Sequence, residues 1–358
     1  MAMSKQLLYF LYGGHPTYIR EAKFSILTAL EYLHDSEIVI RVMTDRPEDF
    51  DGWPVVTEAL SVRQLSSWAG EHGYTHRKKA CAMAAGLALA DKTLFVDSDT
   101  FFKSDPKPLF DQIGNGNYLM DSLEWEWRAT AGFKEFVGLR AALSAQGAMP
   151  PDDMRMYNSG VCGLTRDDGF LFQLSIELID QWHEFCAEIP IVEQVALSFT
   201  LHGKTVHEAN RCIHHYFGSK RYFHAMLALF FSRHGEAYRP SLVTLSREVP
   251  RSKPCPKPWW RLWAKWRLKA FSKAGRKQGR SIFYGCLLPD DAYSQACRAA
   301  WWEGALQEMN GGSFEQSFRS GVWPGDLPRP PSRAGEQAAL EYFHRRLGSV
   351  AQVRNKPS

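Results

Sequence analysis

The sequence has no hydrophobic run long enough to cross a membrane and no Cys-x-x-Cys pair. Its longest apolar stretch, Ala80 to Ala90, is 11 residues long and contains Gly86, whereas a transmembrane helix needs about 18 residues. The apolar run Leu7 to Tyr12 is too short and too aromatic for a secretory signal. The seven cysteines are odd in number and scattered, which argues against a disulfide framework, a zinc site or a redox pair. We therefore expect a cytoplasmic protein without a transmembrane anchor.

Acidic residues are missing from one segment of the chain. Residues 251–280 hold 11 Lys and Arg but no Asp or Glu, so the remainder carries 32 basic against 39 acidic residues, a charge of −7. The composition also changes at Pro250 to Pro258, which favours a domain boundary there. We predict a first domain over residues 1–249 and a C-terminal, mostly helical region over 250–358.

Regular elements alternate in the first domain, and a hydrophobic content of 45% supports a globular core. Hydrophobic spacing predicts strands at 7–12, 37–43, 93–97, 117–120 and 204–207, and helices at 17–34, 77–89, 170–189 and 193–201. A strand, a helix and a strand with short joints open a parallel α/β sheet. The fold class is therefore predicted to be α/β, with helices flanking the sheet.

The most informative motif is a strand-like run that ends in two carboxylates, Asp97 and Asp99. Because side chains alternate along a strand, both carboxylates leave the strand end on the same side and can share one hard divalent cation. Ligands of α/β sheets gather beyond the carboxyl ends of strands. The alternative is a turn in which either aspartate caps the following segment. Asp121 follows the next predicted strand in the same way.

In order along residues 7–221, four motifs resemble the GT-A glycosyltransferases of the glycogenin and lipopolysaccharide galactosyltransferase group (family 8-like). They are Leu94 to Thr100, Asn158-Ser159-Gly160-Val161, Glu193 to Leu197, and His215-Tyr216-Phe217-Gly218. Glu193 replaces the usual Asp, the usual Lys-Pro-Trp after the last motif is absent, and only 20 residues separate Gln194 from His215. The resemblance implies a GT-A (Rossmann-like) mixed sheet flanked by helices.

The resemblance also implies a metal ion. Asp97, Asp99 and His215 would hold Mn²⁺ or Mg²⁺ against a nucleotide diphosphate, and an imidazole ligand favours Mn²⁺. The alternative for His215 is a half-buried histidine bonded to backbone. Transfer of the sugar would retain anomeric configuration, with Gln194 on the face opposite the leaving group and Glu193 and Asp121 on the sugar hydroxyls. A carboxylate at Glu193 is equally explained as a helix cap.

The remaining donor-binding residues come from the same resemblance. Tyr12, Gly13, Tyr18, Thr44 and Asp45 would hold the nucleoside, and Arg77 or Lys79 would hold the diphosphate or the sugar. Lys220 or Arg221 would neutralise the departing diphosphate, Asn158 and Ser159 would bind the sugar, and Ser98 and Gly218 belong to the donor-binding set as well. Ordinary alternatives exist for each group: a left-handed turn at Gly13, solvated cations at Arg77 and Lys79, and a capped turn at Asn158.

The basic segment is rich in tryptophan. Projected on a helix, Arg261, Lys265, Lys269, Ser272 and Arg276 share one face, and Trp259, Trp260, Trp263, Trp266, Ala270 and Phe271 share the other. This pattern is typical of a helix in an anionic membrane interface, and it favours a peripheral position on the inner membrane face. A core-packing helix with a solvated basic face is the alternative, and no motif supports nucleic acid as a partner.

These features predict an enzyme that transfers a sugar from a nucleotide-diphosphate sugar, preferably a UDP-sugar, to a saccharide or lipid-linked glycan acceptor in cell-surface polysaccharide or lipopolysaccharide synthesis. The alternative is a catalytically silent sugar- or lipid-binding scaffold on the same fold. Nucleotidyl transfer would require a glycine-rich phosphate loop followed by a basic residue, which Gly13-Gly14-His15-Pro16 does not resemble.

Overall fold

The computed structural model describes residues 3–309 and 312–354. Its contacts divide the chain into two compact units: unit 1 is Met1–Phe217 with Glu236–Ser246, and unit 2 is Gly218–Gly235 with Arg247–Ser358. The division at Ser246 lies close to the expected one at residue 249. Helix α8 (Lys220–His234) lies within the predicted first domain, but its contacts group it with unit 2.

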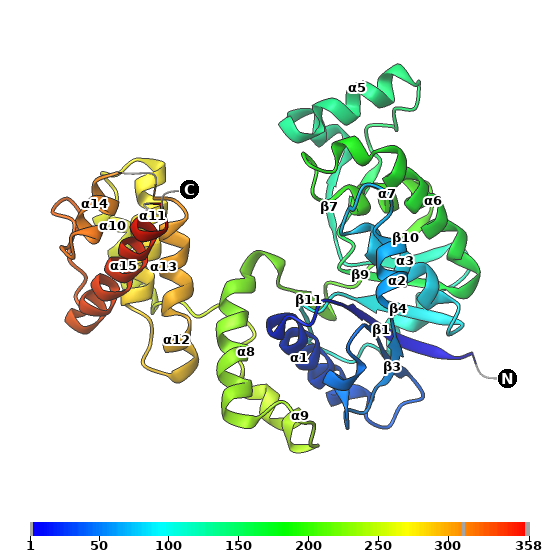
Figure 1. Ribbon diagram of the computed structural model, residues 1–358, viewed down its shortest axis with the longest axis horizontal. Coiled ribbons are helices and arrows are strands. Elements are labelled where there is room, and N and C mark those ends of the chain that lie inside the picture. Colours follow the sequence, from blue (N-terminus) through cyan, green and yellow to red (C-terminus); the bar gives the residue numbers. More distant parts are fainter. Residues whose placement is uncertain (1–2, 310–311, 355–358) are drawn as a thin grey trace. The chain divides into compact units, whose positions relative to one another are not determined.

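A seven-stranded mixed sheet forms the centre of unit 1, in the order β10-β6-β9-β4-β1-β2-β3 (Figure 1). The strands are β1 (Lys5–Leu11), β2 (Val39–Thr44), β3 (Val56–Ala59), β4 (Lys92–Val96), β6 (Asn117–Met120), β9 (Val161–Thr165) and β10 (Thr205–Glu208). β9 runs antiparallel to both of its neighbours, whereas all other adjacent pairs are parallel. The predicted α/β fold with a mixed sheet is confirmed.

Helices cover both faces of this sheet. The hydroxyl groups of Tyr9 on β1 and Ser25 on α1 (Pro16–Leu33) are hydrogen bonded at 2.9 Å. The next side chain toward the N-terminus, Leu8, belongs to a core cluster with α3 (Arg77–Leu87), α6 (Gly169–Gln181) and α7 (Val192–Thr200). Since neighbouring side chains on a strand point to opposite faces, α1 lies on one face and these three helices on the other. Two further helices of unit 1 are α2 (Val62–Trp68) and α9 (Ser241–Leu245).

Two short antiparallel pairs complete the part of unit 1 that positions the site. β5 (Thr100–Phe102) pairs with β11 (Ile213–His215), which sets His215 opposite Thr100. β7 (Leu123–Glu126) pairs with β8 (Arg155–Tyr157). A second buried cluster joins β7 and β8 to α5 (Val137–Ala145), α6 and α7. The remaining short helix is α4 (Lys107–Asp111).

Unit 2 is entirely helical in its described part, as predicted for the C-terminal region. Besides α8 it contains α10 (Pro258–Arg267), α11 (Lys273–Cys286), α12 (Ala292–Ala296), α13 (Arg298–Leu306), α14 (Ser313–Arg319) and α15 (Arg333–Arg354). Its apolar core includes Phe283, Trp302 and Phe343. No helix in residues 3–309 and 312–354 has both the length and the apolar character that crossing a bilayer requires.

The projection of residues 259–276 on one amphipathic helix is wrong, because two helices form there. The chain leaves the helical conformation after Arg267, and the Ser272 side chain then accepts a hydrogen bond from the backbone N–H of Gly275, which starts α11 as a new helix. Serine is a favoured N-cap because its oxygen satisfies a free N–H of the first turn. The basic and tryptophan residues are therefore divided between two helices.

Gly163 in the middle of β9 tests the packing of the central sheet. A Cβ atom there would lie 2.7 Å from Ile113 Cδ1 and 2.8 Å from Leu119 Cβ, so we expect Gly163→Ala to lower the free energy of unfolding by about 1–3 kcal/mol. Urea denaturation measures this loss of stability. Gly169→Ala is the control, because a Cβ at Gly169 meets nothing within 4 Å. Equal stability of the two variants would contradict the close packing of Ile113 and Leu119 against Gly163.

Candidate metal centre

Three side chains with metal-ligating atoms converge at the carboxyl end of β4. Asp97, Asp99 and His215 each offer one ligand atom, and these atoms lie within 4.8 Å of one another. Asp97 and Asp99 follow β4 directly, and the β5–β11 pairing brings His215 beside them. The set of residues that the sequence predicted as metal ligands is therefore assembled by the fold.

His215 is held with its two ring nitrogens in different surroundings. Nε2 lies 3.1 Å from Asp99 Oδ2 and 3.9 Å from Asp97 Oδ2. Nδ1 lies 2.9 Å from Asp121 Oδ2 and 3.1 Å from Asn158 Oδ1. Both of the latter oxygens accept, so Nδ1 carries a hydrogen and Nε2 faces the two carboxylates. A histidine oriented by a carboxylate through its second nitrogen is the usual arrangement around protein-bound metal ions.

A missing side chain makes room for the His215 ring. A Cβ atom at Gly160 would lie 2.2 Å from both Cε1 and Nδ1 of His215. Gly160 also positions Asp97, because its carbonyl accepts a hydrogen bond from the Asp97 N–H at 2.8 Å. Its own N–H donates to Asn158 Oδ1 at 2.9 Å. The Asn158-Ser159-Gly160 loop therefore positions both His215 and Asp97.

Lys79 supplies a positive charge on the other side of Asp97. Its Nζ lies 2.9 Å from Asp97 Oδ2, 3.2 Å from Ser159 Oγ and 3.8 Å from Glu193 Oε1. Burial alone would lower the pKa of Lys79, but the charges of Asp97 and Glu193 outweigh it and hold that pKa above its ordinary value. Lys79 therefore stays charged, and the predicted alternative of a solvated cation does not describe it.

Electrostatics also fixes the charge of His215. Burial alone would lower its pKa, but hydrogen bonds to Asp121 and Asp99 and the charges of Asp99 and Asp97 raise that pKa from 6.5 to about 10. The imidazole is therefore cationic at neutral pH when no metal ion competes for Nε2. Two oxygen ligands, one imidazole and an excess of carboxylates fit a hard to borderline divalent cation such as Mn²⁺ or Mg²⁺.

The predicted catalytic pair lies beside this cluster at the start of α7. Glu193 Oε2 accepts a hydrogen bond from Ser159 at 3.3 Å. Its Oε1 is buried and has no hydrogen-bond donor within residues 3–309 and 312–354. Gln194 Nε2 donates to Glu124 Oε2 at 2.6 Å. Glu193 Oε1 faces Lys79 Nζ at 3.8 Å, so an ion pair compensates the charge of this buried carboxylate, although the oxygen makes no hydrogen bond.

Glu124 on β7 is a site residue that the sequence did not reveal. Its Oε1 accepts from Asn158 Nδ2 at 2.9 Å and its Oε2 from Gln194. The carboxylate therefore ties the loop before β9 to the first turn of α7. The sequence held only a weak signal for it, a glutamate three residues after Asp121 in a strand with two polar and two apolar side chains.

The predicted nucleoside residues gather at the carboxyl ends of β1 and β2. The Gly13 N–H donates to the Asp45 carboxylate at 3.0 Å, with Gly13 at φ +83°. Thr44 is buried and its hydroxyl accepts from the Arg46 N–H. Tyr12 is half-buried beneath Lys78, whereas Tyr18 is exposed. The Gly13–Asp45 bond closes a turn, so the ordinary explanation for this glycine also holds.

Four other predicted donor-binding residues have no contact with this cluster that supports their predicted role. Arg77 forms a bidentate ion pair with Asp180 at 2.6 and 2.8 Å, so its guanidinium is engaged away from Asp97. Ser98 donates to buried Glu21 at 3.1 Å. Gly218 and Lys220 belong to unit 2, and their roles in donor binding stay predictions.

Comparison with known proteins gives structural likenesses only, since no protein-family model and no curated protein matches the chain. Galactosyltransferase LgtC in complex with donor and acceptor sugar analogs is similar at 13% identity and a TM-score of 0.41, covering 72% of this chain and 99% of that one. An active-site mutant of LgtC is similar at 15% identity and a TM-score of 0.39, and the match covers 57% of this chain and 73% of that one. Mouse xyloside xylosyltransferase 1 is similar at 13% identity and a TM-score of 0.38, and the match covers 57% of this chain and 84% of that one. At these TM-scores the likeness is remote, and the chemistry has to come from the residues themselves.

Gly160→Ala tests whether the seat of His215 matters for metal binding. The added methyl group must displace the imidazole, so we expect Mn²⁺ affinity to fall by about 10- to 100-fold, as when a metal ligand loses its support. Isothermal titration with MnCl₂ measures this. Gly114→Ala is the control, since a Cβ there meets nothing within 4 Å. Unchanged Mn²⁺ affinity in a folded Gly160→Ala variant would show that His215 is not a ligand.

The raised pKa of His215 predicts how stability changes with pH in metal-free protein. The shift from 6.5 to about 10 gives stability that is fully present below pH 6.5 and is lost as pH rises through 10. Urea denaturation in EDTA should therefore show wild type more stable than His215→Gln by up to about 5 kcal/mol at pH 6, with the difference shrinking toward pH 10. A difference that stays constant over this range would contradict a cationic His215.

Proposed function

We propose that the protein is a metal-dependent glycosyltransferase that moves a sugar from a nucleotide-diphosphate sugar, preferably a UDP-sugar, to a saccharide or lipid-linked glycan acceptor. The observation that carries this proposal is the convergence of Asp97, Asp99 and His215 within 4.8 Å at the carboxyl edge of the sheet. The β1–β4 boundary, where the strand order reverses, is where α/β sheets bind nucleotides. Transfer with retention, in cell-surface polysaccharide or lipopolysaccharide synthesis at the inner membrane face, belongs to the same proposal.

The metal ligands and the side chains that orient them would act on the leaving group. Asp97, Asp99 and His215 would hold a divalent cation, which would supply positive charge to the departing diphosphate. Asp121 holds Nδ1 of His215 and so directs Nε2 toward the two aspartates. Lys79 holds Asp97 from the opposite side. Both contacts set the ligand directions before the substrate arrives, which lowers the cost of reorganisation during reaction.

The sugar would be recognised by acceptors and donors that are already fixed in place. Glu193 Oε1 lies 3.8 Å from Lys79 Nζ and makes no hydrogen bond in the described residues, so a sugar hydroxyl that reaches this oxygen would be favoured over an epimer that cannot. Gln194 is held by Glu124, which restrains its amide at the start of α7. The acceptor hydroxyl can lose its proton to the departing diphosphate oxygen, so no strong protein base is required.

Asp99→Asn tests the proposal directly, because it removes one charge and keeps the shape of the side chain. We expect Mn²⁺-dependent hydrolysis of the donor sugar, found by screening nucleotide sugars, to fall at least about 100-fold, as when a group that stabilises transition-state charge is removed. Coupled detection of the released nucleoside diphosphate measures the rate. Asp153→Asn is the matched control, because Asp153 is exposed.

The same assay separates the enzyme from a silent scaffold. Chelation with EDTA should abolish hydrolysis, and Mn²⁺ or Mg²⁺ should restore it, if the site works with a cation. Tight nucleotide-sugar binding that is unaffected by EDTA, together with no turnover, would instead identify a sugar-binding scaffold. Nucleotide-sugar binding is measured by the change in melting temperature with each nucleotide sugar, with and without Mn²⁺.

A further inference from the structure

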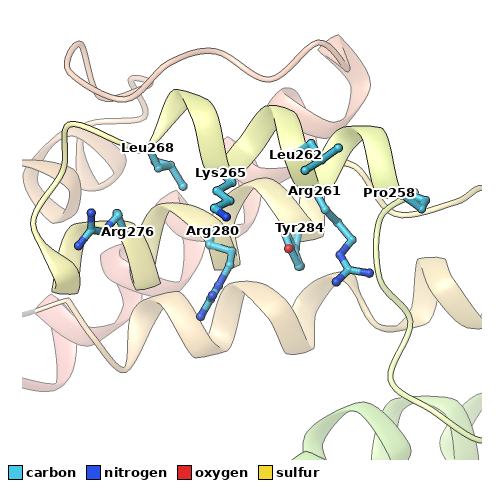
Figure 2. A pocket seen from close by; sticks show the side chains of 8 residues that line it. All are labelled: Pro258, Arg261, Leu262, Lys265, Leu268, Arg276, Arg280 and Tyr284. Carbon is cyan, nitrogen blue, oxygen red and sulfur yellow. The ribbon is translucent and has the colours of Figure 1, made fainter.

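Unit 2 contains a pocket of about 500 Å³ between α10 and α11. Figure 2 shows the eight side chains that line it: Pro258, Arg261, Leu262, Lys265, Leu268, Arg276, Arg280 and Tyr284. The pocket exists because the chain turns between Arg267 and Ser272, which folds α11 back beside α10. A single continuous helix would have no such cavity.

Four cations line this pocket and no carboxylate does. Arg261 and Lys265 are one helical turn apart on α10, and Arg276 and Arg280 are one turn apart on α11, so each helix presents its pair on one face. Within residues 3–309 and 312–354, none of the four forms an ion pair with an acidic side chain. Like charges on two facing helices repel each other, and a bound anion would relieve that repulsion.

The pocket also has an apolar side. Leu262, Leu268 and Tyr284 contribute hydrocarbon and ring surface to its lining. Leu262 belongs at the same time to an exposed strip on α10, where Trp259, Leu262 and Trp266 are 56%, 67% and 68% exposed. Their spacing of three and four residues places them on one helix face. Leu262 therefore connects the cationic pocket to an exposed apolar surface.

We propose that this pocket binds the phosphate head group of a membrane lipid, while Leu262, Trp259 and Trp266 contact its hydrocarbon chain. Arginine guanidinium groups match phosphate oxygens with paired hydrogen bonds, and lysine adds a point charge. Tryptophan side chains favour the membrane–water boundary. A free phosphate ion would use the cations alone and would leave the exposed strip without a partner. The lipid joins both features in one ligand.

The inference does not depend on the proposed sugar transfer, because every residue in it belongs to unit 2. It also differs from diffuse attraction of a basic protein to an anionic membrane. Lys269 and Lys273 are exposed cations of the same segment but do not line the pocket. Diffuse attraction would use them as much as Arg276 and Arg280.

The test compares two double variants that lose the same charge. Co-sedimentation of the full chain with phosphatidylcholine vesicles containing phosphatidic acid is measured at fixed salt for wild type, Arg276→Gln/Arg280→Gln and Lys269→Gln/Lys273→Gln. We expect the first double variant to bind at least about tenfold more weakly than the second. Circular dichroism checks that each variant is folded. If the glutamine pair fails to fold, Arg276→Lys/Arg280→Lys keeps the charge and should still weaken binding through lost hydrogen-bond geometry.

A second arm distinguishes a lipid from a soluble phosphate. Leu262→Ser/Trp266→Ser should weaken vesicle binding while leaving the titration with glycerol 3-phosphate unchanged. Equal losses in the two charge variants would overturn the pocket as the site. Binding of glycerol 3-phosphate without binding to the vesicles would overturn the lipid as its occupant.

Discussion

The candidate site depends on the balance of charge around His215. Five carboxylates meet in a largely buried region, from Asp97, Asp99, Asp121, Glu124 and Glu193. Their mutual repulsion in a medium of low polarity is large. Lys79 and the cationic imidazole compensate part of it, and hydrogen bonds from Asn158, Ser159 and Gln194 compensate more. A divalent cation would complete this balance, so affinity for metal follows from the same forces that hold the site together.

The two halves of the site differ in how firmly they are fixed. Around α7, Glu124 links the loop before β9 to the helix, so Asn158 and Gln194 are restrained by one carboxylate. At the ends of β1 and β2, Gly13 and Asp45 close a turn, while Tyr18 is exposed. The side chains around Glu124 are thus tied by more hydrogen bonds, and the surface at the ends of β1 and β2 is more open.

Sequence spacing predicted the features that depend on local geometry. The order of strands and helices is enough to give the fold class. The strand-like run ending at Asp97 is enough to predict that Asp97 and Asp99 meet, although β4 ends at Val96 and both residues lie in the short segment after it. His215 required the resemblance, because its position depends on the β5–β11 pairing across more than a hundred residues. The contacts of Glu124 with Asn158 and Gln194, and the close approach of His215 to Gly160, are tertiary. Arg77 likewise meets Asp180 through the packing of α3 on α6. The start of α11 at Ser272 is a local capping signal that the helical projection of the segment did not use.

The reversed direction of β9 has a consequence for how such a site can be assembled. In a purely parallel sheet, only segments that leave strands reach the edge where β4 and β6 end. Because β9 runs the opposite way between them, the segment that enters it, Asn158 to Gly160, reaches that edge as well. One inverted strand therefore doubles the kinds of chain segment that can meet there, and allows an incoming turn to support side chains that outgoing turns present.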